Sequence, residues 1–352
     1  MKLVLIGALA SVAACSGTSD PPVDATPTTT KPPPGEFARV LENLPGGLMN
    51  VWGTSASDVF VVGADPGPGP GVYHYDGEAW TRLKTGTSGD LWWTYGFKGG
   101  PVFMGGANGT ILKYEAGTFT KLPTPGSDVV FGIWGASPTD LWAVGGRQTG
   151  GGAFAWRWDG SAWTPAQGLP ADTAGAIFFK VWGCSPSDVW IVGAADPNVT
   201  STTEGLCVHW DGAAFTHASC AIAQRLLTVH SACTSSPALY EAVGGSATAA
   251  CAVNAGGVWA KERCDDAPQL MGVCLTATGG WATSAYGDVY YRGSHGWEYV
   301  EPTVDSSQPL HACWVDPDGG LWAAGGDVFS PPMINGVLIY RGAKAPSGEV
   351  KE

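Results

Sequence analysis

The sequence predicts an all-β fold in which short four-stranded sheets repeat around a closed ring. Three observations predict it. A short apolar run with one aromatic residue and a closing glycine occurs seven times, at intervals of 39 to 50 residues. A tight-turn signal followed by a second aromatic residue comes after six of these runs. No helical pattern of apolar residues competes with these strand signals. The repeat is therefore typical of a β-propeller, in which each repeat forms one sheet.

The apolar runs have the character of buried strands. Examples are DVFVVG at 58–63, DLWAVGG at 140–146 and DVWIVG at 188–193. Each is short, apolar and closed by glycine, as expected for a strand in the middle of a sheet. Their aromatic residues are Phe60, Phe103, Trp142, Trp190, Tyr240, Trp281 and Trp322. We expect one of these runs at the centre of each of seven blades.

The second series predicts hairpins and also predicts how the ring closes. Pairs such as Asp-Gly in HYDGEAW and RWDGSAW favour turns that need positive φ. The aromatic residues that follow are Trp80, Phe119, Trp163, Phe215, Trp259 and Trp297. The last run, VLIYRG at 337–342, has no such partner, whereas Phe37 precedes Trp80 by one period of 43 residues. The sequence therefore predicts a seven-bladed β-propeller whose N-terminal strand completes the last blade and leaves no open edge.

A phrase of the form WG-x-S-x-x-D marks the start of several repeats, at 52–58, 134–140 and 182–188. In the second and third copies, Pro138 and Pro186 at the second turn position preset φ, and the serine and aspartate can accept hydrogen bonds from turn amides. We interpret the phrase as a repeated structural turn between the first and second strands rather than a site of chemistry. The corresponding positions on the first strands are Trp52, Tyr95, Trp134, Trp182, His230, Cys274 and Cys313.

The N-terminal segment predicts export and anchoring. Residues 1–14 combine one lysine with an apolar stretch, as in a secretory signal peptide. Val12-Ala13-Ala14-Cys15 resembles a bacterial lipobox, which implies that Cys15 becomes the lipidated N-terminus; the alternative is ordinary cleavage after Ala14 with Cys15 incidental. Residues 15–35 form a Pro- and Thr-rich tether that cannot bury a core. We predict the propeller at 36–343 and a C-terminal tail at 344–352. Ser16 after the lipidated cysteine favours the outer membrane, since an aspartate there favours the inner one in such lipoproteins.

Composition and cysteine content narrow the classes of partner and compartment. The 352 residues carry a formal charge of −13 without any basic run, which argues against nucleic acid and anionic lipid headgroups as partners. Eight cysteines follow Cys15, and an exported chain favours four disulfides over a metal site, because no CxxC or Cys/His cluster is present. Equal spacings and shared strand registers suggest one set among 105 possible connectivities. That set is Cys207–Cys220, Cys251–Cys264, Cys184–Cys233 and Cys274–Cys313.

Two resemblances support the fold. GGRQTGGGAFAWRWDGSAWTPAQGLP at 145–170 resembles a kelch repeat. The WG-x-S-x-x-D phrase is similar to the repeats of secreted propeller lipoproteins from myxobacteria and their relatives. A partial likeness to the Asp-box of sialidase-type propellers lacks the Ser-x-Asp-x-Gly order. Together these resemblances cover roughly residues 36–342 and imply a propeller fold rather than any activity.

The sequence contains no recognisable catalytic constellation. GxSxG, HExxH, phosphate-loop and dinucleotide motifs are absent, and the histidines are scattered. His74 and His209 share a strand register with Lys113 and Arg157, which favours a solvated face over a site. Asp316-Pro317-Asp318-Gly319-Gly320 lacks the remaining ligands of a calcium loop and reads as a turn. We therefore assign no catalytic residue, no metal ligand and no cofactor.

Irregular loops are the strongest indication of function. With the strands of each blade named a to d in chain order, the b–c and d–a connections are long and unlike one another, and a propeller places both on one face. Varied loops on a rigid scaffold are typical of binding surfaces. The first candidates on these loops are Asp65, Arg147, Asp196, Glu204, Asp327 and Phe329. The sequence favours an envelope-anchored scaffold that binds an unidentified protein or glycan and touches the bilayer only through its N-terminal lipid. The alternatives are a propeller enzyme acting on an extracellular polysaccharide or other polymer, and a structural surface protein.

Overall fold

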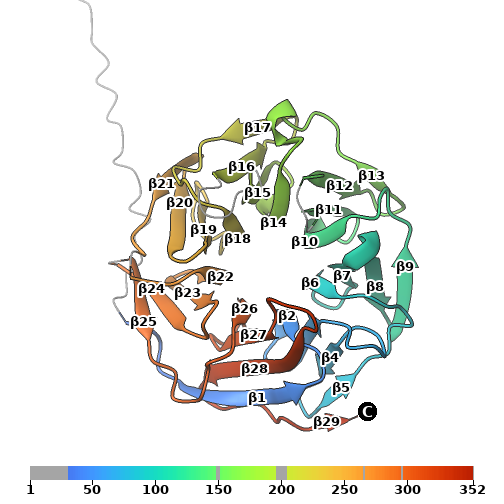
Figure 1. Ribbon diagram of the computed structural model, residues 1–352, viewed down its shortest axis with the longest axis vertical. Coiled ribbons are helices and arrows are strands. Elements are labelled where there is room, and N and C mark those ends of the chain that lie inside the picture. Colours follow the sequence, from blue (N-terminus) through green and yellow to red (C-terminus); the bar gives the residue numbers. More distant parts are fainter. Residues whose placement is uncertain (1–30, 148–150, 196–203, 265, 295, 352) are drawn as a thin grey trace, which may run out of the picture.

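Seven sheets stand around a central axis, as the sequence predicted, and four adjacent antiparallel strands form the body of each (Figure 1). The computed structural model describes residues 31–147, 151–195, 204–264, 266–294 and 296–351. The predicted signal peptide, Cys15 and most of the tether lie outside these residues. In the described part the only helical segments are two 3-10 turns, Ala107–Gly109 and Ala171–Thr173. No helix long and apolar enough to cross a membrane occurs among the described residues.

The blades follow one another along the chain. Blade 1 contains β2 (Leu48–Ser55), β3 (Asp58–Gly63), β4 (Val72–Tyr75) and β5 (Trp80–Arg82). Blade 2 contains β6 (Leu91–Gly96), β7 (Val102–Gly106), β8 (Ile111–Glu115) and β9 (Thr118–Leu122). Blade 3 contains β10 (Val129–Ser137), β11 (Asp140–Gly146), β12 (Phe154–Trp158) and β13 (Trp163–Pro165). Blade 4 contains β14 (Ile177–Ser185), β15 (Asp188–Ala194), β16 (Gly205–Trp210) and β17 (Phe215–Ala218).

The remaining blades complete the ring. Blade 5 contains β18 (Leu226–His230), β19 (Leu239–Gly245), β20 (Ala249–Ala255) and β21 (Val258–Lys261). Blade 6 contains β22 (Leu270–Thr276), β23 (Gly279–Ser284), β24 (Val289–Gly293) and β25 (Gly296–Val300). Blade 7 contains β26 (Leu310–Val315), β27 (Leu321–Asp327), β28 (Ile334–Gly342) and β1 (Glu36–Leu44).

Both ends of the described chain take part in closing the ring. Strand β1 pairs antiparallel with β28, with Phe37 opposite Arg341, which confirms the predicted N-terminal closure. The C-terminal residues, predicted only as a tail, contribute a fifth strand to blade 1. This strand, β29 (Val350–Lys351), pairs parallel with β5, and the Trp80 indole Nε1–H donates to the carbonyl of Ser347 at 3.1 Å. The first and last blades are therefore tied by chain segments from opposite ends of the sequence.

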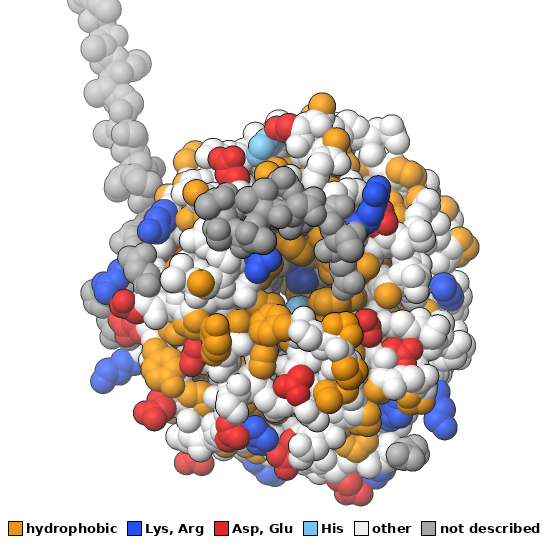
Figure 2. All heavy atoms as spheres, in the orientation of Figure 1, with side chains coloured by type: hydrophobic (Ala, Val, Ile, Leu, Met, Phe, Trp, Pro, Cys, Tyr) orange, Lys and Arg blue, Asp and Glu red, His pale blue; other side chains and the backbone are white. Residues whose placement is uncertain are grey.

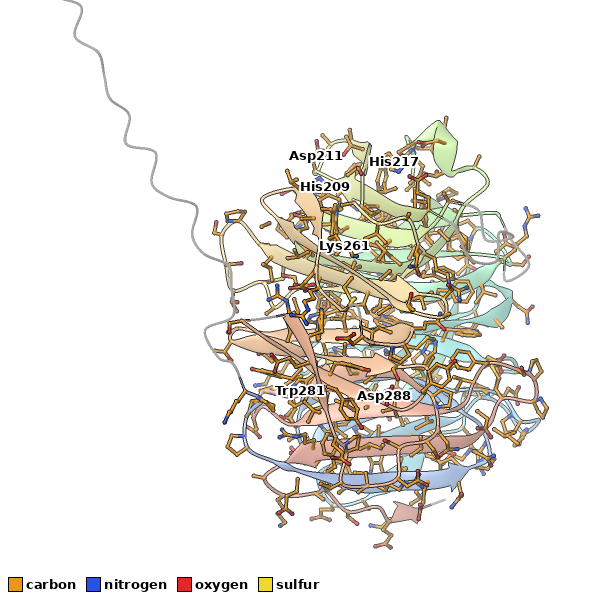
Figure 3. The ribbon with its side chains drawn as sticks, turned by 60° about the vertical axis from the view of Figure 1, so that its left-hand side comes forward. His209, Asp211, His217, Lys261, Trp281 and Asp288 are labelled. Atoms are coloured by element: carbon orange, nitrogen blue, oxygen red, sulfur yellow. A yellow bond between two sulfur atoms is a disulfide. The ribbon has the colours of Figure 1, made fainter. Side chains whose placement is uncertain are left out.

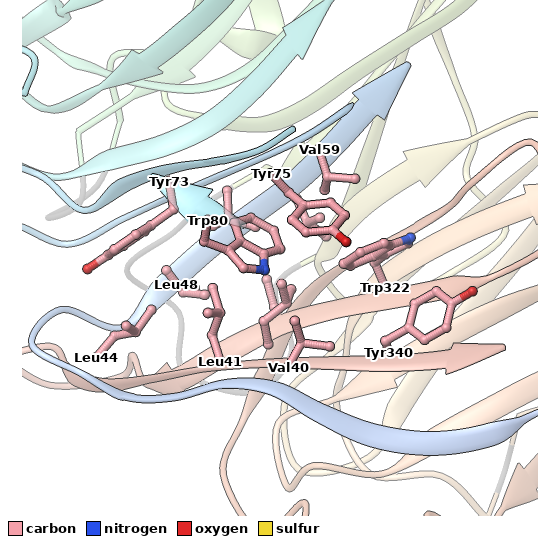
Figure 4. Packing of buried hydrophobic residues seen from close by; sticks show 14 residues of the cluster. Val40, Leu41, Leu44, Leu48, Val59, Tyr73, Tyr75, Trp80, Trp322 and Tyr340 are labelled. Atoms are coloured by element: carbon pink, nitrogen blue, oxygen red, sulfur yellow. The ribbon is translucent and has the colours of Figure 1, made fainter. Parts of the chain in front are cut away.

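Aromatic residues on the second and fourth strands pack neighbouring blades together. Each junction between adjacent blades has its own buried hydrophobic cluster. At the closing junction, Trp80 of blade 1 meets Trp322 and Tyr340 of blade 7, with the two indole centroids 6.2 Å apart (Figure 4). Burying one large apolar side chain contributes ~1.5–3 kcal/mol. The ring is thus stabilised junction by junction.

Two of the first-strand positions assigned from the sequence are wrong by one residue. Trp52, for example, pairs with Phe60 as expected. However, His230 pairs with Glu241 rather than Tyr240, and Trp314 rather than Cys313 pairs with Trp322. In these repeats the WG phrase is absent, so the sequence offers no marker for the register.

The aspartate of the repeated phrase has a structural role that differs from the predicted one. Asp58 Oδ1 lies 2.7 Å from His74 Nε2, and the His74 ring stacks on Phe60 at 4.1 Å. The same arrangement of an aspartate, a basic residue and an aromatic ring recurs in two other blades, with Asp140, Arg157 and Trp142, and with Asp188, His209 and Trp190. The phrase serine does accept the turn amide, as Ser57 N–H to Ser55 Oγ shows. The aspartate of the phrase, at the start of strand b, therefore binds a basic side chain on strand c, and that side chain packs on the aromatic ring of strand b.

Four disulfides connect the pairs of cysteines that the sequence suggested. Cys184–Cys233 joins blades 4 and 5, and Cys274–Cys313 joins blades 6 and 7, with Cα separations of 5.3 and 5.9 Å. Cys207–Cys220 and Cys251–Cys264 each link a third strand to the segment that follows the fourth. Disulfides persist in oxidising compartments, so the chain is suited to a periplasmic or extracellular environment.

A buried ion cluster lies between blades 5 and 6. Arg292 on β24 places Nε 2.5 Å from Glu241 Oε1 and Nη2 2.6 Å from Glu262 Oε1. One guanidinium cannot neutralise two carboxylates. Glu241 is completely buried, and its burial, with the adjacent Glu262 charge, raises its carboxyl pKa well above the usual value despite Arg292. Glu241 is thus protonated in the folded protein at pH values where it is ionised in the unfolded chain.

This assignment predicts a pH-dependent effect of Glu241→Gln. The folded state binds the extra proton, so wild-type stability falls as pH rises from about 4.5 towards the folded pKa, whereas the glutamine variant escapes this loss. The variant should gain on the wild type by up to ~1.4 kcal/mol per pH unit in that interval. Urea unfolding from acid to mildly alkaline pH measures the difference, with the exposed Glu298→Gln as control. A constant offset between variant and wild type would contradict the assignment.

Candidate functional site

A cavity of about 490 Å³ opens at the centre of the ring. It lies on the face that carries the b–c and d–a connections, where Figure 2 shows a hollow surrounded by hydrophobic side chains, with basic and histidine side chains near its centre. Residues from the starts of the inner strands and from the b–c loop of blade 7 line it. A concave, largely apolar site with a few polar groups is the usual form of a binding pocket.

A repeated β-bulge creates the cavity wall. Every inner strand shifts register near its start, as between Leu91 and Trp93 on β6 and between Phe178 and Lys180 on β14. Such a bulge inserts one unpaired residue and redirects its side chain. We call the seven residues inside these shifts the bulge ring: Met49, Trp92, Phe131, Phe179, Leu227, Met271 and His311. All except Met49, which is buried beside Ala64 and Val328, line the cavity.

The inner strands approach one another closely just beyond the bulge ring. A Cβ on Gly132 would lie 3.1 Å from Lys180 Cα of the next blade, and one on Gly272 would lie 2.9 Å from Ala312 Cα. Small residues are therefore required at these positions. The bulge ring and the narrowing beyond it were not predicted, because a bulge leaves no turn residue or change of composition in the sequence.

Lys180 is a buried cation in the cavity wall. Only 6% of its surface is exposed, and its Nζ donates to the carbonyl of Phe131 at 2.8 Å while lying 4.4 Å from the Trp93 ring centroid. Burial lowers the pKa of this amine to about 7. Among the described residues no carboxylate lies within ion-pair distance of it. A cation–π contact is the main compensation for its charge.

His311 is the polar member of the bulge ring. Its Nδ1 lies 2.6 Å from the carbonyl of Met49, so Nδ1 carries the proton and donates it. Burial, helped by the nearby charge of Lys180, lowers the imidazole pKa to about 4. The ring meets Trp92 edge to face at 5.8 Å. His311 is therefore a neutral imidazole near pH 7.

The cavity rim adds one further cation and one carboxylate. Arg225 Nε–H donates to the carbonyl of Gly245 at 2.9 Å, and the Gln269 amide donates to the same oxygen at 3.1 Å. Asp90 Oδ1 accepts the backbone N–H of Asp65 at 2.8 Å. The described lining residues therefore include two basic side chains, Lys180 and Arg225, and one carboxylate, Asp90. The cavity thus has more basic than acidic side chains, although the net charge of the whole chain is −13.

One of the predicted loop residues lies at this cavity. Phe329 lines its rim with 55% of its surface exposed. Asp65 instead accepts backbone N–H groups of Gly67 and Gly69 and so shapes its own loop. Asp196 lies outside the described residues.

The remaining loop candidates have other surroundings. Arg147 Nε lies 3.7 Å from Asp128 Oδ2, and Asp327 accepts the Asn335 amide at 2.6 Å. Glu204 is exposed, and its carbonyl accepts the N–H of Ala195 at 3.0 Å. These three residues do not line the central cavity.

The other polar candidates lie away from the central cavity, and two of them, Glu204 and His217, line a separate open pocket on blade 4. His209 and His217 lie on the outer strands of blade 4 (Figure 3), and His217 Nδ1 lies 2.6 Å from Asp172 Oδ2. Asp316 accepts turn amides of Asp318 and Gly320 and the indole N–H of Trp322. No group of metal-binding side chains occurs among the described residues.

The ring of seven sheets and its central cavity define a seven-bladed β-propeller. The structure is similar to a streptogramin B lyase, at 12% identity and a TM-score of 0.66, covering 86% of this chain and 97% of that one. It is similar to YCF48 bound to D1 peptide, at 12% identity and a TM-score of 0.62, covering 93% and 100%. It also resembles a catalytically inactive virginiamycin B lyase from Staphylococcus aureus with quinupristin, at 13% identity and a TM-score of 0.61, covering 87% and 99%. No family model and no curated protein matches the chain. At these identities the likeness shows the fold alone.

The narrowing beyond the bulge ring predicts a cost for adding a single methyl group. Gly272→Ala places Cβ against Ala312 Cα and Thr283 Oγ1 and should destabilise the protein by ~1–3 kcal/mol, as overpacking does. Gly175→Ala is the matched control, because its Cβ meets no atom within 4 Å and the change should stay within ~0.5 kcal/mol. Urea unfolding compares the two variants. Equal stabilities would show that the inner strands are not closely packed at this level.

Proposed function

We propose that the protein is an envelope-anchored lipoprotein whose propeller binds another protein through the central cavity. The observation that carries the proposal is the bulge ring, which brings one side chain from nearly every blade to a single cavity of mixed apolar and polar lining, on the face with irregular loops. The exposed ring of Phe329 extends this surface outwards. Binding loops held on a rigid scaffold, with aromatic side chains exposed at the rim of the site, are typical of protein recognition.

The chemistry of the lining favours a protein partner over a glycan. Aromatic and aliphatic side chains, with Met271 and Met333, dominate the wall. The amide of Gln269 already donates to Gly245, which leaves few neutral polar groups for sugar hydroxyls. The structurally similar YCF48, bound to D1 peptide, supports the proposal to the extent that a propeller of this shape accommodates a peptide.

An enzyme acting on a polysaccharide has less support. Glycoside hydrolysis commonly needs two facing carboxyl groups. Among the described cavity residues Asp90 is the sole carboxylate, and one of its oxygens accepts a backbone N–H. The similarity to two lyases in the structural comparison concerns the fold, so an enzyme remains the alternative that the binding experiments must exclude.

The proposed location is the outer membrane. Disulfides within the propeller support an oxidising environment outside the cytoplasm. The lipobox-like Val12-Ala13-Ala14-Cys15 and the tether at 16–35 would then attach the propeller to the bilayer through lipid alone. A Pro- and Thr-rich tether of this length would leave the cavity free to meet its partner at a distance from the membrane surface.

Site-specific photo-crosslinking tests the binding face. With p-benzoylphenylalanine at Phe329, irradiated cells should yield a discrete protein adduct, whereas the same group at Val258 should not. Val258 is 72% exposed beside a c–d turn and so reports the opposite face. Leu227→Glu, which changes the cavity wall, should abolish the adduct at 329 without altering the near-ultraviolet circular dichroism. Equal adducts at both positions, or glycan-array binding without any protein adduct, would contradict the proposal.

Lipid attachment predicts distinct behaviour for two adjacent substitutions. Cys15→Ala should prevent palmitate labelling and release the protein from the membrane fraction, because no other membrane anchor is proposed. Ser16→Asp should keep the label but move the protein to the inner membrane. Membrane fractionation with metabolic labelling measures both. Membrane retention of the Cys15→Ala protein would contradict lipid anchoring.

A further inference from the structure

The residue at the position of Lys180 can be compared with the equivalent residue in each of the other six blades. Lys180 directly follows the bulge residue Phe179, and the residues that follow the other six bulges are Asn50, Trp93, Gly132, Thr228, Gly272 and Ala312. None of these six is charged. The propeller therefore does not require a cation at this level of the channel, and a neutral residue serves in every other blade.

The charge of Lys180 is incompletely compensated. An ammonium group has three N–H donors, and in the described structure one of them is used, by the carbonyl of Phe131. Burying a cation is unfavourable unless it is paired. The facing groups do not supply an anion, since His311 is neutral, Arg225 is itself a cation and Asp90 makes no ion pair with Lys180 in the described structure. The cavity thus presents a positive centre with unused donors.

Apolar walls surround this positive centre. Phe131, Phe179, Leu227 and Met271 line the same cavity. A ligand that fills the cavity must therefore combine an anionic group with apolar surface. The net charge of −13 disfavours a polyanion such as nucleic acid, because the remainder of the chain repels it.

We propose that the cavity binds a protein segment that places a carboxylate, flanked by apolar side chains, against Lys180. This inference rests on the proposed function and specifies the chemistry of its partner. The carboxylate forms a charge-assisted hydrogen bond with the free donors of the ammonium group. It belongs either to the C-terminus of the partner or to an Asp or Glu side chain, and the experiment separates these two sources.

Protonation makes the proposal testable by pH. Because the Lys180 pKa lies near 7, the cation is the main form below that pH and is progressively lost above it. A bound carboxylate favours the charged amine and so raises its pKa. Binding near pH 8 should take up a proton, and affinity should fall about tenfold per pH unit above 7. The other basic groups on the cavity, Arg225 and His311, do not change charge in this interval.

Two matched probe pairs measure the preference by isothermal titration calorimetry on the intact protein. N-acetyl-L-phenylalanine and N-acetyl-L-phenylalaninamide test a terminal carboxylate. The capped tripeptides acetyl-Phe-Glu-Phe-amide and acetyl-Phe-Gln-Phe-amide test a side-chain carboxylate. We expect the acid of at least one pair to bind about tenfold tighter than its neutral partner near pH 6, and the pair that shows this identifies the source.

Variants assign the preference to Lys180. Lys180→Met should abolish the discrimination between acid and neutral probe, whereas Lys113→Met, which removes a partly exposed lysine paired with Glu115 on β8, should preserve it. Lys180→Arg should retain the preference but lose its pH dependence. If neither Lys180 variant folds, proton uptake by the wild type, measured in buffers of different ionisation enthalpy, decides the matter.

The possible results are distinguishable. Equal affinity for acid and neutral probes, or binding by the acid without proton uptake near pH 8, overturns the inference and leaves the proposed protein-binding function intact. Absence of binding by all four probes at millimolar concentration overturns the inference as well. In that case the adduct at position 329 decides separately whether the proposed function stands.

Discussion

Packing between adjacent blades is the interaction on which the rest of this structure depends. Each four-stranded sheet buries its faces only against its two neighbours, so no blade has a hydrophobic core of its own. Rings such as Trp80 and Trp322 meet at a junction, and every junction needs the one beside it. A break at any point would expose two apolar faces. The strands β1 and β29 therefore stabilise the junction between blades 7 and 1, where the first and last blades of the chain meet.

The same packing explains where the cavity lies. Outer strands are separated by large aromatic side chains, while the inner strands converge on small residues such as Gly132 and Gly272. The cavity at the axis lies where the inner strands deviate from regular pairing. The bulge supplies this deviation at the same place in each blade, and the repeated irregularity produces one site instead of seven.

The sequence predicted those features that depend on local residue type. Glycine-terminated aromatic runs and Asp-Gly turns identified the strands, and Phe37 was placed correctly because its period matched that of Trp80. The cysteine pairs were predicted from equal spacing and from position on adjacent blades, although the register assigned to Cys313 was wrong by one residue. The sequence did not predict the cavity, because its residues are widely separated along the chain and include ordinary core types such as Phe131 and Leu227. Their importance arises from the bulge, which depends on tertiary pairing.

The loop residues selected from the sequence show the same limitation. Asp65 and Asp327 are polar and lie on irregular connections, yet their side chains satisfy groups close to them. Phe329 reaches the cavity because the loop after β27 turns towards the axis, a direction that loop length alone does not encode.

Two features depart from the repeat, the Cys274–Cys313 disulfide and Lys180, and they have different physical consequences. In blades 6 and 7 the Cys274–Cys313 bond joins the inner strands next to the level at which Trp52 and Tyr95, 6.0 Å apart, make an aromatic contact in blades 1 and 2; Cys313 lies one residue before the equivalent position. One stabilising contact has been replaced by another, so this departure preserves the ring. Lys180 is different, because it contacts the neighbouring blades, at Phe131 and Trp93, through a charged group, and burying a charge without an anionic partner costs free energy. A substitution that the scaffold does not need, placed in the wall of its central cavity, is best explained by what enters that cavity.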